Sequence, residues 1–431
     1  MGLDLSMIYA GYERRDGRGK AAYHPLMMVR ILLYGYCLGI MSSRRMERAT
    51  YEDLAFRYLS AGQHPDHDTI AGFRRQHLPA LAQLFTQVLQ LCDQAGLVKL
   101  GHVAIDGTKL KANASKHKAM SYERMEKKEK QLKAEVEKLL AEAAETDAAN
   151  DGLCGKGKRG DALHAELTRR ERRLQKIAEA KAALEQEARE RAEVAKKAVE
   201  EKLQQRWKQE QKRGRKFGGR RPRVPDPDKA RPEPTAQRNF TDPESRIMPD
   251  GANKGSFLQG YNAQAAVDGQ NQIIVAAAIT QDTNDKKQLL PMLEQVEQNL
   301  GRKPETVTAD AGYFSQAALT DEKVKEVDLL VPPDQQKHAP AAVQNPRVDF
   351  PPVVGVKTFS ETMRERLRSP EGNTIYKLRK QIVEPVFGQI KEARRIRAFL
   401  LRGLRKVHAE WQLICATHNL LKLFRAGLPA L

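Results

Sequence analysis

The sequence predicts an α/β protein built on a mixed five-stranded sheet with flanking helices, together with an all-α N-terminal region and an inserted helical arm. Three observations predict this organisation. Before residue 98, apolar residues recur at three- and four-residue spacing, as on the buried face of helices. Residues 121–213 are rich in Glu, Lys, Ala, Arg, Gln and Leu. After residue 256, short apolar or β-branched runs alternate with helical patterns.

The charge balance favours a polyanionic partner. The chain has 431 residues, of which 74 are Lys or Arg and 55 are Asp or Glu, for a formal net charge of +19. Nucleic acid is the first candidate and an anionic membrane surface the second. The apolar run 25–41 contains Arg30 and falls short of the roughly 20 residues of a membrane helix, so no membrane partner is expected.

The cellular compartment is expected to be a reducing cytoplasm. No signal peptide follows Met1, because Asp4 and a polar segment come next. The four cysteines are isolated and show no CxxC spacing, which fits free thiols. They are Cys37, Cys92, Cys154 and Cys415. The chain starts abruptly at Met1-Gly-Leu-Asp-Leu, which leaves open whether its beginning is shortened.

Residues 1–98 are predicted to form a helical DNA-binding domain. Short helical patterns with several arginines fit a helix-turn-helix-like module, although a plain bundle with a solvated basic face explains the same residues. The arginines are Arg44, Arg45, Arg48, Arg74 and Arg75. A zinc site at His64, His67 and His77 is not expected, because no cysteine accompanies them.

Residues 121–213 are predicted to form a coiled-coil insertion. Met125, Leu132 and Leu139 are spaced by sevens, and a three-four-three spacing runs from Leu174 to Leu184. A Gly-rich break at 151–160 separates two helical parts, which predicts a protruding hairpin or a dimerising arm. A single exposed helix with charge pairs is the alternative.

A basic flexible linker is predicted at residues 214–255. Between Arg206 and Arg231 there are 11 Lys or Arg against 3 Asp or Glu, interleaved with glycines and prolines. Such a segment suits contact along a phosphate backbone, and a solvated tether is the alternative reading.

The remaining strand-like and helical patterns predict the order of strands and helices in the core. Residues 99–120 hold a first strand that ends at Asp106, and 256–431 hold the rest: a hairpin at 260–279, a helix, a strand ending at Asp310, and a further helix, strand and helix. Strand, hairpin, helix, strand, helix, strand, helix is the order of an RNase H-like domain. The long insertion would then lie between its first and second strands.

Three acidic residues are candidates for metal binding. Asp106 and Asp310 each follow a short apolar run near a glycine, so each is expected at the C-terminal edge of a strand, where ligands gather in open α/β sheets. Glu384 follows in a basic, helical stretch. Each alone is an ordinary turn or cap residue, but three in this order suit Mg²⁺ or Mn²⁺.

Four motifs carry a resemblance to a known family. They are Ala104-Ile-Asp-Gly-Thr-Lys-Leu-Lys-Ala-Asn113, Gly260-Tyr-Asn-Ala-Gln264, Thr308-Ala-Asp-Ala-Gly-Tyr313 and Val383-Glu-Pro-Val-Phe-Gly-Gln-Ile-Lys391. In this order they resemble bacterial insertion-sequence transposases of the DDE type, in the group with a Tyr-Arg-Glu-Lys signature. The resemblance covers nearly the whole chain and implies a cytoplasmic, nucleoid-associated enzyme.

The resemblance implies Asp106, Asp310 and Glu384 as catalytic residues and ligands of two Mg²⁺ ions, for which Mn²⁺ substitutes. With this site the enzyme would cleave the terminal inverted repeats of the element and join them to target DNA. The protein would act as a homodimer. The expected DNA contacts are Lys391, Tyr376, Arg379, Lys380, Lys109 and Lys111.

The signature departs from the usual spacing in one place. Four residues rather than three separate Arg379 from Glu384, and Lys380 has the expected spacing instead. On a continuous helix Lys380 and Glu384 would share a face with Tyr376, and Arg379 would point away. Pro385 further predicts a kink with Glu384 as the cap of a new helix.

Two other functions remain open from the sequence. A non-catalytic protein that bridges DNA, or a decayed transposase, would need only the basic segments and the arm. A metal-dependent nuclease would cleave without strand transfer.

Overall fold

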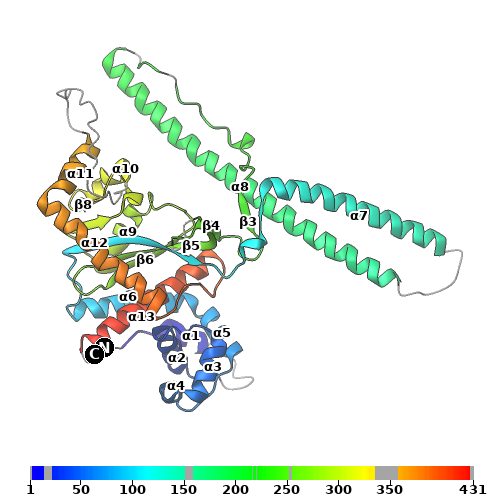
Figure 1. The fold of residues 1–431 in the computed structure, drawn as a ribbon, viewed down its shortest axis with the longest axis horizontal. Coiled ribbons are helices and arrows are strands. Elements are labelled where there is room, and N and C mark those ends of the chain that lie inside the picture. Colours follow the sequence, from blue (N-terminus) through cyan, green and yellow to red (C-terminus); the bar gives the residue numbers. More distant parts are fainter. Residues whose placement is uncertain are drawn as a thin grey trace. The chain divides into compact units, whose positions relative to one another are not determined.

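The computed structural model describes residues 2–13, 22–150, 159–215, 217–219, 221–251, 255–334 and 358–427. These residues divide into two compact units (Figure 1). The first comprises residues 1–113 and 248–431, and the second comprises residues 114–247. The N-terminal helices therefore belong to the same compact unit as the sheet, which differs from the separate domain predicted for residues 1–98.

The first unit is centred on a mixed sheet with flanking helices. Its strands run in the order β4-β5-β1-β7-β8, and β6 pairs with β5. β1 is antiparallel to β5 and parallel to β7, and β7 is parallel to β8. The sheet has one strand more than predicted. The strands are β1 (His102–Lys111), β4 (Arg246–Pro249), β5 (Phe257–Asp268), β6 (Ile274–Thr280), β7 (Thr306–Ala309) and β8 (Asp328–Leu330).

Strand β1 is longer than the sequence predicted. Gly107 was expected to stop it after Asp106, but its antiparallel pairing with β5 continues from Val103 to Lys111. The parallel pairing with β7 does end there, at Ile105 opposite Ala309. Asp106 consequently lies inside β1, at the point where its pairing with the neighbouring strand β7 ends and its pairing with β5 continues.

Helices pack around this sheet. α9 and α13 contact β6, and α12 contacts β1 and β5. The predicted hairpin is confirmed as β5 and β6, whereas the helix predicted at 316–327 shortens to one turn of α10 and a separate 3₁₀ turn. The helices are α9 (Leu289–Leu300), α10 (Gln316–Leu319), α11 (Phe359–Arg368), α12 (Pro370–Gly388) and α13 (Leu404–Arg425). The Pro-rich segment 335–357 lies outside the described residues.

A buried polar cluster fastens the N-terminal helices to α13. The Glu410 carboxylate accepts hydrogen bonds from the backbone N–H groups of Leu400 and Leu401, at 3.1 and 2.9 Å, and from the Tyr36 hydroxyl at 3.4 Å. Arg74 donates to the Tyr36 hydroxyl at 3.2 Å. The N-terminal helices are α1 (Ser6–Glu13), α2 (Pro25–Cys37), α3 (Ser43–Glu52), α4 (Leu54–Leu59), α5 (His67–Gln76) and α6 (Leu78–Gln94).

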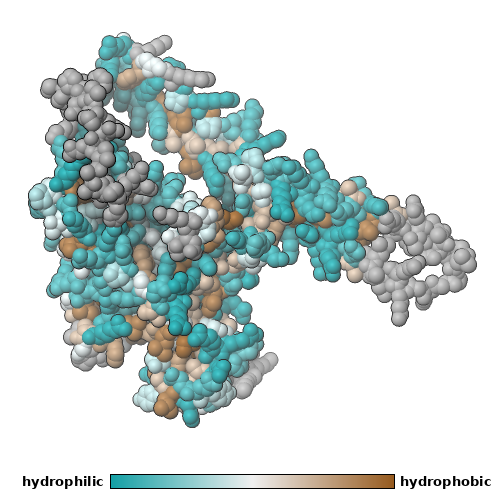
Figure 2. Space-filling view, viewed as in Figure 1, coloured by the Kyte–Doolittle hydropathy of each residue, from teal (hydrophilic) through white to brown (hydrophobic). Residues whose placement is uncertain are grey.

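The second unit contains a helical hairpin. α7 (Tyr122–Asn150) and α8 (Arg159–Arg213) run antiparallel, because Glu129 pairs with Lys181 while Glu135 pairs with Arg170. A narrow apolar seam joins them, and the surface visible in Figure 2 is mostly hydrophilic over both helices. The buried residues of the seam are Tyr122, Met125, Leu132, Ile177, Ala180 and Leu184. Residues 151–158 of the Gly-rich break, including Cys154, lie outside the described residues.

The segment predicted as a flexible linker is partly ordered. Its residues 237–239 form β3 (Gln237–Asn239), which pairs with β2 (Ala119–Ser121) at the base of the hairpin. Asp228 and Arg238 form ion pairs with Arg189 and Glu187 of α8, at 2.6 Å each. The basic charge of this segment is therefore held partly against acidic positions of the helix.

Three cysteines, Cys37, Cys92 and Cys415, are free thiols, as expected. Among the helices of the described residues, none combines the length and apolar character needed to cross a membrane.

Candidate functional site

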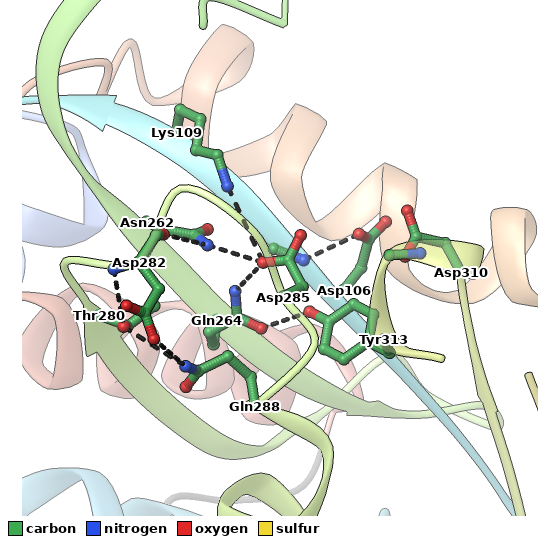
Figure 3. Close-up of polar contacts among 12 residues, drawn as sticks. Asp106, Lys109, Asn262, Gln264, Thr280, Asp282, Asp285, Gln288, Asp310 and Tyr313 are labelled. Atoms are coloured by element: carbon green, nitrogen blue, oxygen red, sulfur yellow. Dashed lines mark hydrogen bonds and ion pairs between the residues drawn. The ribbon is translucent and has the colours of Figure 1, made fainter. Parts of the chain in front are cut away.

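Two of the predicted acidic residues lie side by side where β1 and β7 part. Asp310 directly follows β7, and the register pairs the preceding Ala309 with Ile105, the residue before Asp106. Asp310 begins a 3₁₀ turn and accepts the Gly312 N–H at 2.8 Å. Figure 3 shows the two carboxylates next to each other. Asp310 follows the end of its strand as predicted, whereas Asp106 lies inside β1, at the point where its parallel pairing with β7 ends.

The site disfavours two negative charges. Burial raises the pKa of Asp106 to about 6, against the opposing effect of the Arg379 guanidinium, and the neighbouring Asp310 raises it further. Burial also raises the pKa of Asp310 above its ordinary value. A bound cation would favour the ionised forms of both groups, so the two side chains fit a divalent ion with oxygen ligands.

Arg379 neutralises Asp106 in this structure. Its Nη1 donates to Asp106 Oδ2 at 2.9 Å, and the two side chains are only 10% and 20% exposed. Arg379 does point away from Lys380 and Glu384, as predicted, but it is the Arg379 side of the helix, and not the Glu384 side, that faces Asp106. The helix turns this residue inward because Ile382, Val383 and Val386 form the buried face of α12 beside it.

Glu384 is not brought to Asp106 and Asp310. It is exposed on α12, as is Lys380, because five residues of helix rotate it by about 140° from Arg379. The predicted kink is also absent: α12 continues through Pro385 to Gly388. Proline cannot donate to the carbonyl four residues earlier, and that carbonyl, of Gln381, accepts the Gln272 side-chain amide at 3.0 Å instead.

Of the residues predicted to contact DNA, some lie against the site and others are exposed. Lys391 reaches β1, where its Nζ donates to the Thr108 hydroxyl, and Lys109 is half-buried on the same strand. Burial lowers the pKa of both ammonium groups. Lys111 is exposed at the end of β1. Tyr376 lies beside Arg379, whose guanidinium is 6.0 Å from the ring centre, and packs against α11 and β8.

Asp285 was not predicted from the sequence. It lies in the loop between β6 and α9, and its Oδ1 accepts the side-chain amides of Asn262 at 2.6 Å and Gln264 at 2.7 Å (Figure 3). Lys109 Nζ is 3.8 Å from the same oxygen. The only signal was the pair of amides in the Gly260–Gln264 motif, which are fully buried and require partners.

Two models of known protein families match this chain. A model described as "Transposase DDE domain" matches residues 229–420. A second, described as "Transposase domain (DUF772)", matches residues 3–76. The chain belongs to the insertion-sequence DDE transposases. Neither the curated proteins nor the solved structures contain a match to this transposase.

The two matches cover the site unequally. Asp310, Arg379 and Glu384 lie within the DDE match, whereas Asp106 lies outside both. The case for Asp106 in this transposase therefore depends on geometry, namely its position beside Asp310. Among the described residues, no three His, Cys, Asp or Glu side chains come together as a complete set of metal ligands.

Proposed function

We propose that this transposase cleaves the ends of its own mobile element and joins them to target DNA at Asp106 and Asp310. The observation that carries the proposal is the adjacent placement of these two buried carboxylates at the end of the β1–β7 ladder. The strand order, with a central β1 flanked by an antiparallel hairpin and parallel β7 and β8, supports an RNase H-like core.

The proposed chemistry assigns roles to the residues of the site. Mg²⁺ or Mn²⁺, bound as two ions, would supply activation of the attacking oxygen and stabilisation of the leaving oxygen. Asp106 and Asp310 would hold the ions. Arg379 would leave Asp106 and become available to a DNA phosphate, and Lys391 and Lys109 would add positive charge near the strand to be cut.

Glu384 is proposed as the third carboxylate on the resemblance alone, since it is exposed on α12 in the DNA-free chain. For Glu384 to take part, α12 must turn once the Arg379–Asp106 ion pair opens. We expect Glu384→Gln to reduce cleavage by at least about 10²-fold if it holds an ion. Single-turnover cleavage at saturating DNA measures this. Unchanged cleavage in Glu384→Gln, beside Glu371→Gln on the same helix as control, would remove Glu384 from the site.

The experiment that tests the proposed function is cleavage and joining of a labelled duplex that carries the end of the element. Mg²⁺-dependent cleaved and joined products, absent in EDTA, are expected. Cleavage without joining would support a nuclease. DNA binding without products would support the bridging or decayed alternative. The dimer expected from the sequence remains a prediction, to be checked by light scattering with and without DNA.

The helical arm offers a surface for the DNA backbone. Four basic side chains, Arg169, Arg172, Arg173 and Lys176, line one groove on α8 with the small residues Ala165 and Thr168 between them. We call these four the basic stripe. None of the four has an ion-pair partner among the described residues, in contrast to the neighbouring Arg170, which pairs with Glu135 and Glu166. Arg173 and Lys176 also line an adjoining groove with His117, Lys118 and Arg124.

We expect replacement of the basic stripe by glutamine to weaken DNA binding about 10- to 100-fold and to reduce the salt slope by roughly 3 to 4. Fluorescence anisotropy with a labelled duplex at several salt concentrations measures both. The matched control removes four charges that are already ion-paired on the arm, Lys127, Lys133, Arg189 and Arg191. Equal losses in both variants would indicate an effect of net charge alone.

A further inference from the structure

Asp285 is the centre of a polar network on the face of the sheet opposite Asp106. Side chains alternate along a strand, so Asp106 and Thr108 share one face of β1, where Arg379 and Lys391 bind them. Gly107 and Lys109 share the other face with their partners in β5, Gln264 and Asn262. Asp285 accepts hydrogen bonds on this second face.

The network ends at the turn that carries Asp310. Gln264 Nε2 donates to Asp285 Oδ1, and Gln264 Oε1 accepts a hydrogen bond from the hydroxyl of Tyr313. Tyr313 is fully buried and is the last residue of the 3₁₀ turn that Asp310 begins. The indole N–H of Trp411 also fixes the backbone of Gln264, by donating to its carbonyl oxygen at 3.0 Å. A fixed Gln264 thus connects Asp285 to the Asp310 turn.

Asp285 also approaches Asp310 directly. A side-chain carbon at Gly312 would lie 2.9 Å from Asp310 Oδ1 and 3.5 Å from Asp285 Oδ2, so both oxygens face the same space. A cation at Asp310 would be attracted by both charges.

Glycine at position 107 is required by the same network. A side-chain carbon there would lie 2.4 Å from Gln264 Nε2 and 2.9 Å from Asp285 Oδ1. Beside it, Asn262 Oδ1 is fully buried and has no hydrogen-bond partner. Leaving a buried carbonyl oxygen unpaired costs roughly 1–3 kcal/mol, and such oxygens are suitable ligands for hard cations.

We propose that Asp285 is a positioning residue of the cation site: it orients Gln264 and the Asp310 turn, and its charge strengthens cation binding at Asp310. This inference rests on the proposed function, because it needs a cation at Asp310. It adds a carboxylate from the β6–α9 loop to the residues that determine metal affinity.

The test is Mn²⁺ binding to the full-length chain without DNA, measured by isothermal titration calorimetry. Asp285→Asn keeps an oxygen toward Asn262 and Gln264 but removes the charge and the oxygen that faces Gly312. We expect it to weaken Mn²⁺ binding about 10- to 100-fold, as for other residues that support metal ligands. Tyr313→Phe, which alters no charge at neutral pH, should give a smaller loss in the same direction.

The matched control is Asp282→Asn, in the same loop, whose side chain contacts only Gln288 among the hydrogen bonds of Figure 3, at 3.4 Å. Affinity within twofold of native for Asp285→Asn, even with a lowered melting temperature, would show a merely structural role and overturn the inference. If Asp310→Asn binds Mn²⁺ like the native chain, the cation site itself is wrong, and the proposed function fails with it. The two failures are therefore separable.

Discussion

Replacing Asp310 by asparagine should reduce Mg²⁺-dependent cleavage by at least about 10³-fold, which corresponds to roughly 4 kcal/mol of transition-state stabilisation. Asparagine keeps an oxygen that can accept the Gly312 N–H, so the 3₁₀ turn is preserved. The variant loses the charge that we propose holds the ions. Single-turnover cleavage of a labelled duplex measures the loss, and anisotropy should show DNA binding within a few-fold of native.

The chain provides a close control in Asp321→Asn. Asp321 begins a 3₁₀ turn in the same way, by accepting the Lys323 N–H at 3.0 Å, but it lies outside the candidate site. Its replacement should leave cleavage unchanged. Similar losses in the two variants would indicate damage to the fold, and no loss in Asp310→Asn would exclude it as an ion ligand.

The second large effect concerns stability. Glu410→Ala should destabilise the first unit by about 3 kcal/mol or more, because the buried Tyr36 hydroxyl and the part-buried N–H groups of Leu400 and Leu401 would lose their acceptor. A lowered melting temperature in calorimetry is the expected result. Glu392→Ala is the control, since Glu392 is an exposed partner of Arg397 and its loss should change little. A melting temperature equal to that of the control would show that the cluster does not fasten the N-terminal helices.

The same carboxyl should also give stability a pH dependence. Burial raises the pKa of Glu410 above 4.5 in the folded chain. At pH values between 4.5 and the raised pKa, the folded chain binds more protons than the unfolded chain. The contribution of Glu410 to the free energy of unfolding therefore falls as pH rises. Glu410→Gln cannot titrate and should lack that decline. Melting temperatures of the native and variant chains from about pH 4 to 8 should separate as pH rises, with the native chain falling relative to the variant, and parallel curves would contradict the assignment.

The sequence was sufficient for features set by local patterns. The β5–β6 hairpin, the apolar seam of the arm and the Asp310 strand each follow from periodicity over a few residues. The place of Asp106 within β1 was harder to predict from the sequence. The length of β1 is determined by its pairing with β5, more than 150 residues later. Gly107 looked like a strand terminator, but its lack of a side chain serves the contacts of Gln264 and Asp285.

The contacts of α12 and of the β6–α9 loop could not be predicted for a related reason. Helical spacing indicated which side chains share a face with Arg379, but not which face turns inward. That choice is made by the burial of Ile382 and Val386 against the sheet. Asp285 has no distinctive neighbours in sequence, and its importance appears only when the fold brings Asn262 and Gln264 beneath it.

The short β2–β3 ladder makes the arm separable from the rest of the chain. The arm's two ends meet where Ala119 pairs with Asn239 and Ser121 with Gln237, so residues 122–236 close on themselves like the loop of a hairpin. The register of β1 with β5 is fixed by their own pairing within the first unit. A tight turn grafted after Ser121 would therefore replace the arm without changing the pairing of β1 and β5, and helices of other lengths are compatible with the same sheet.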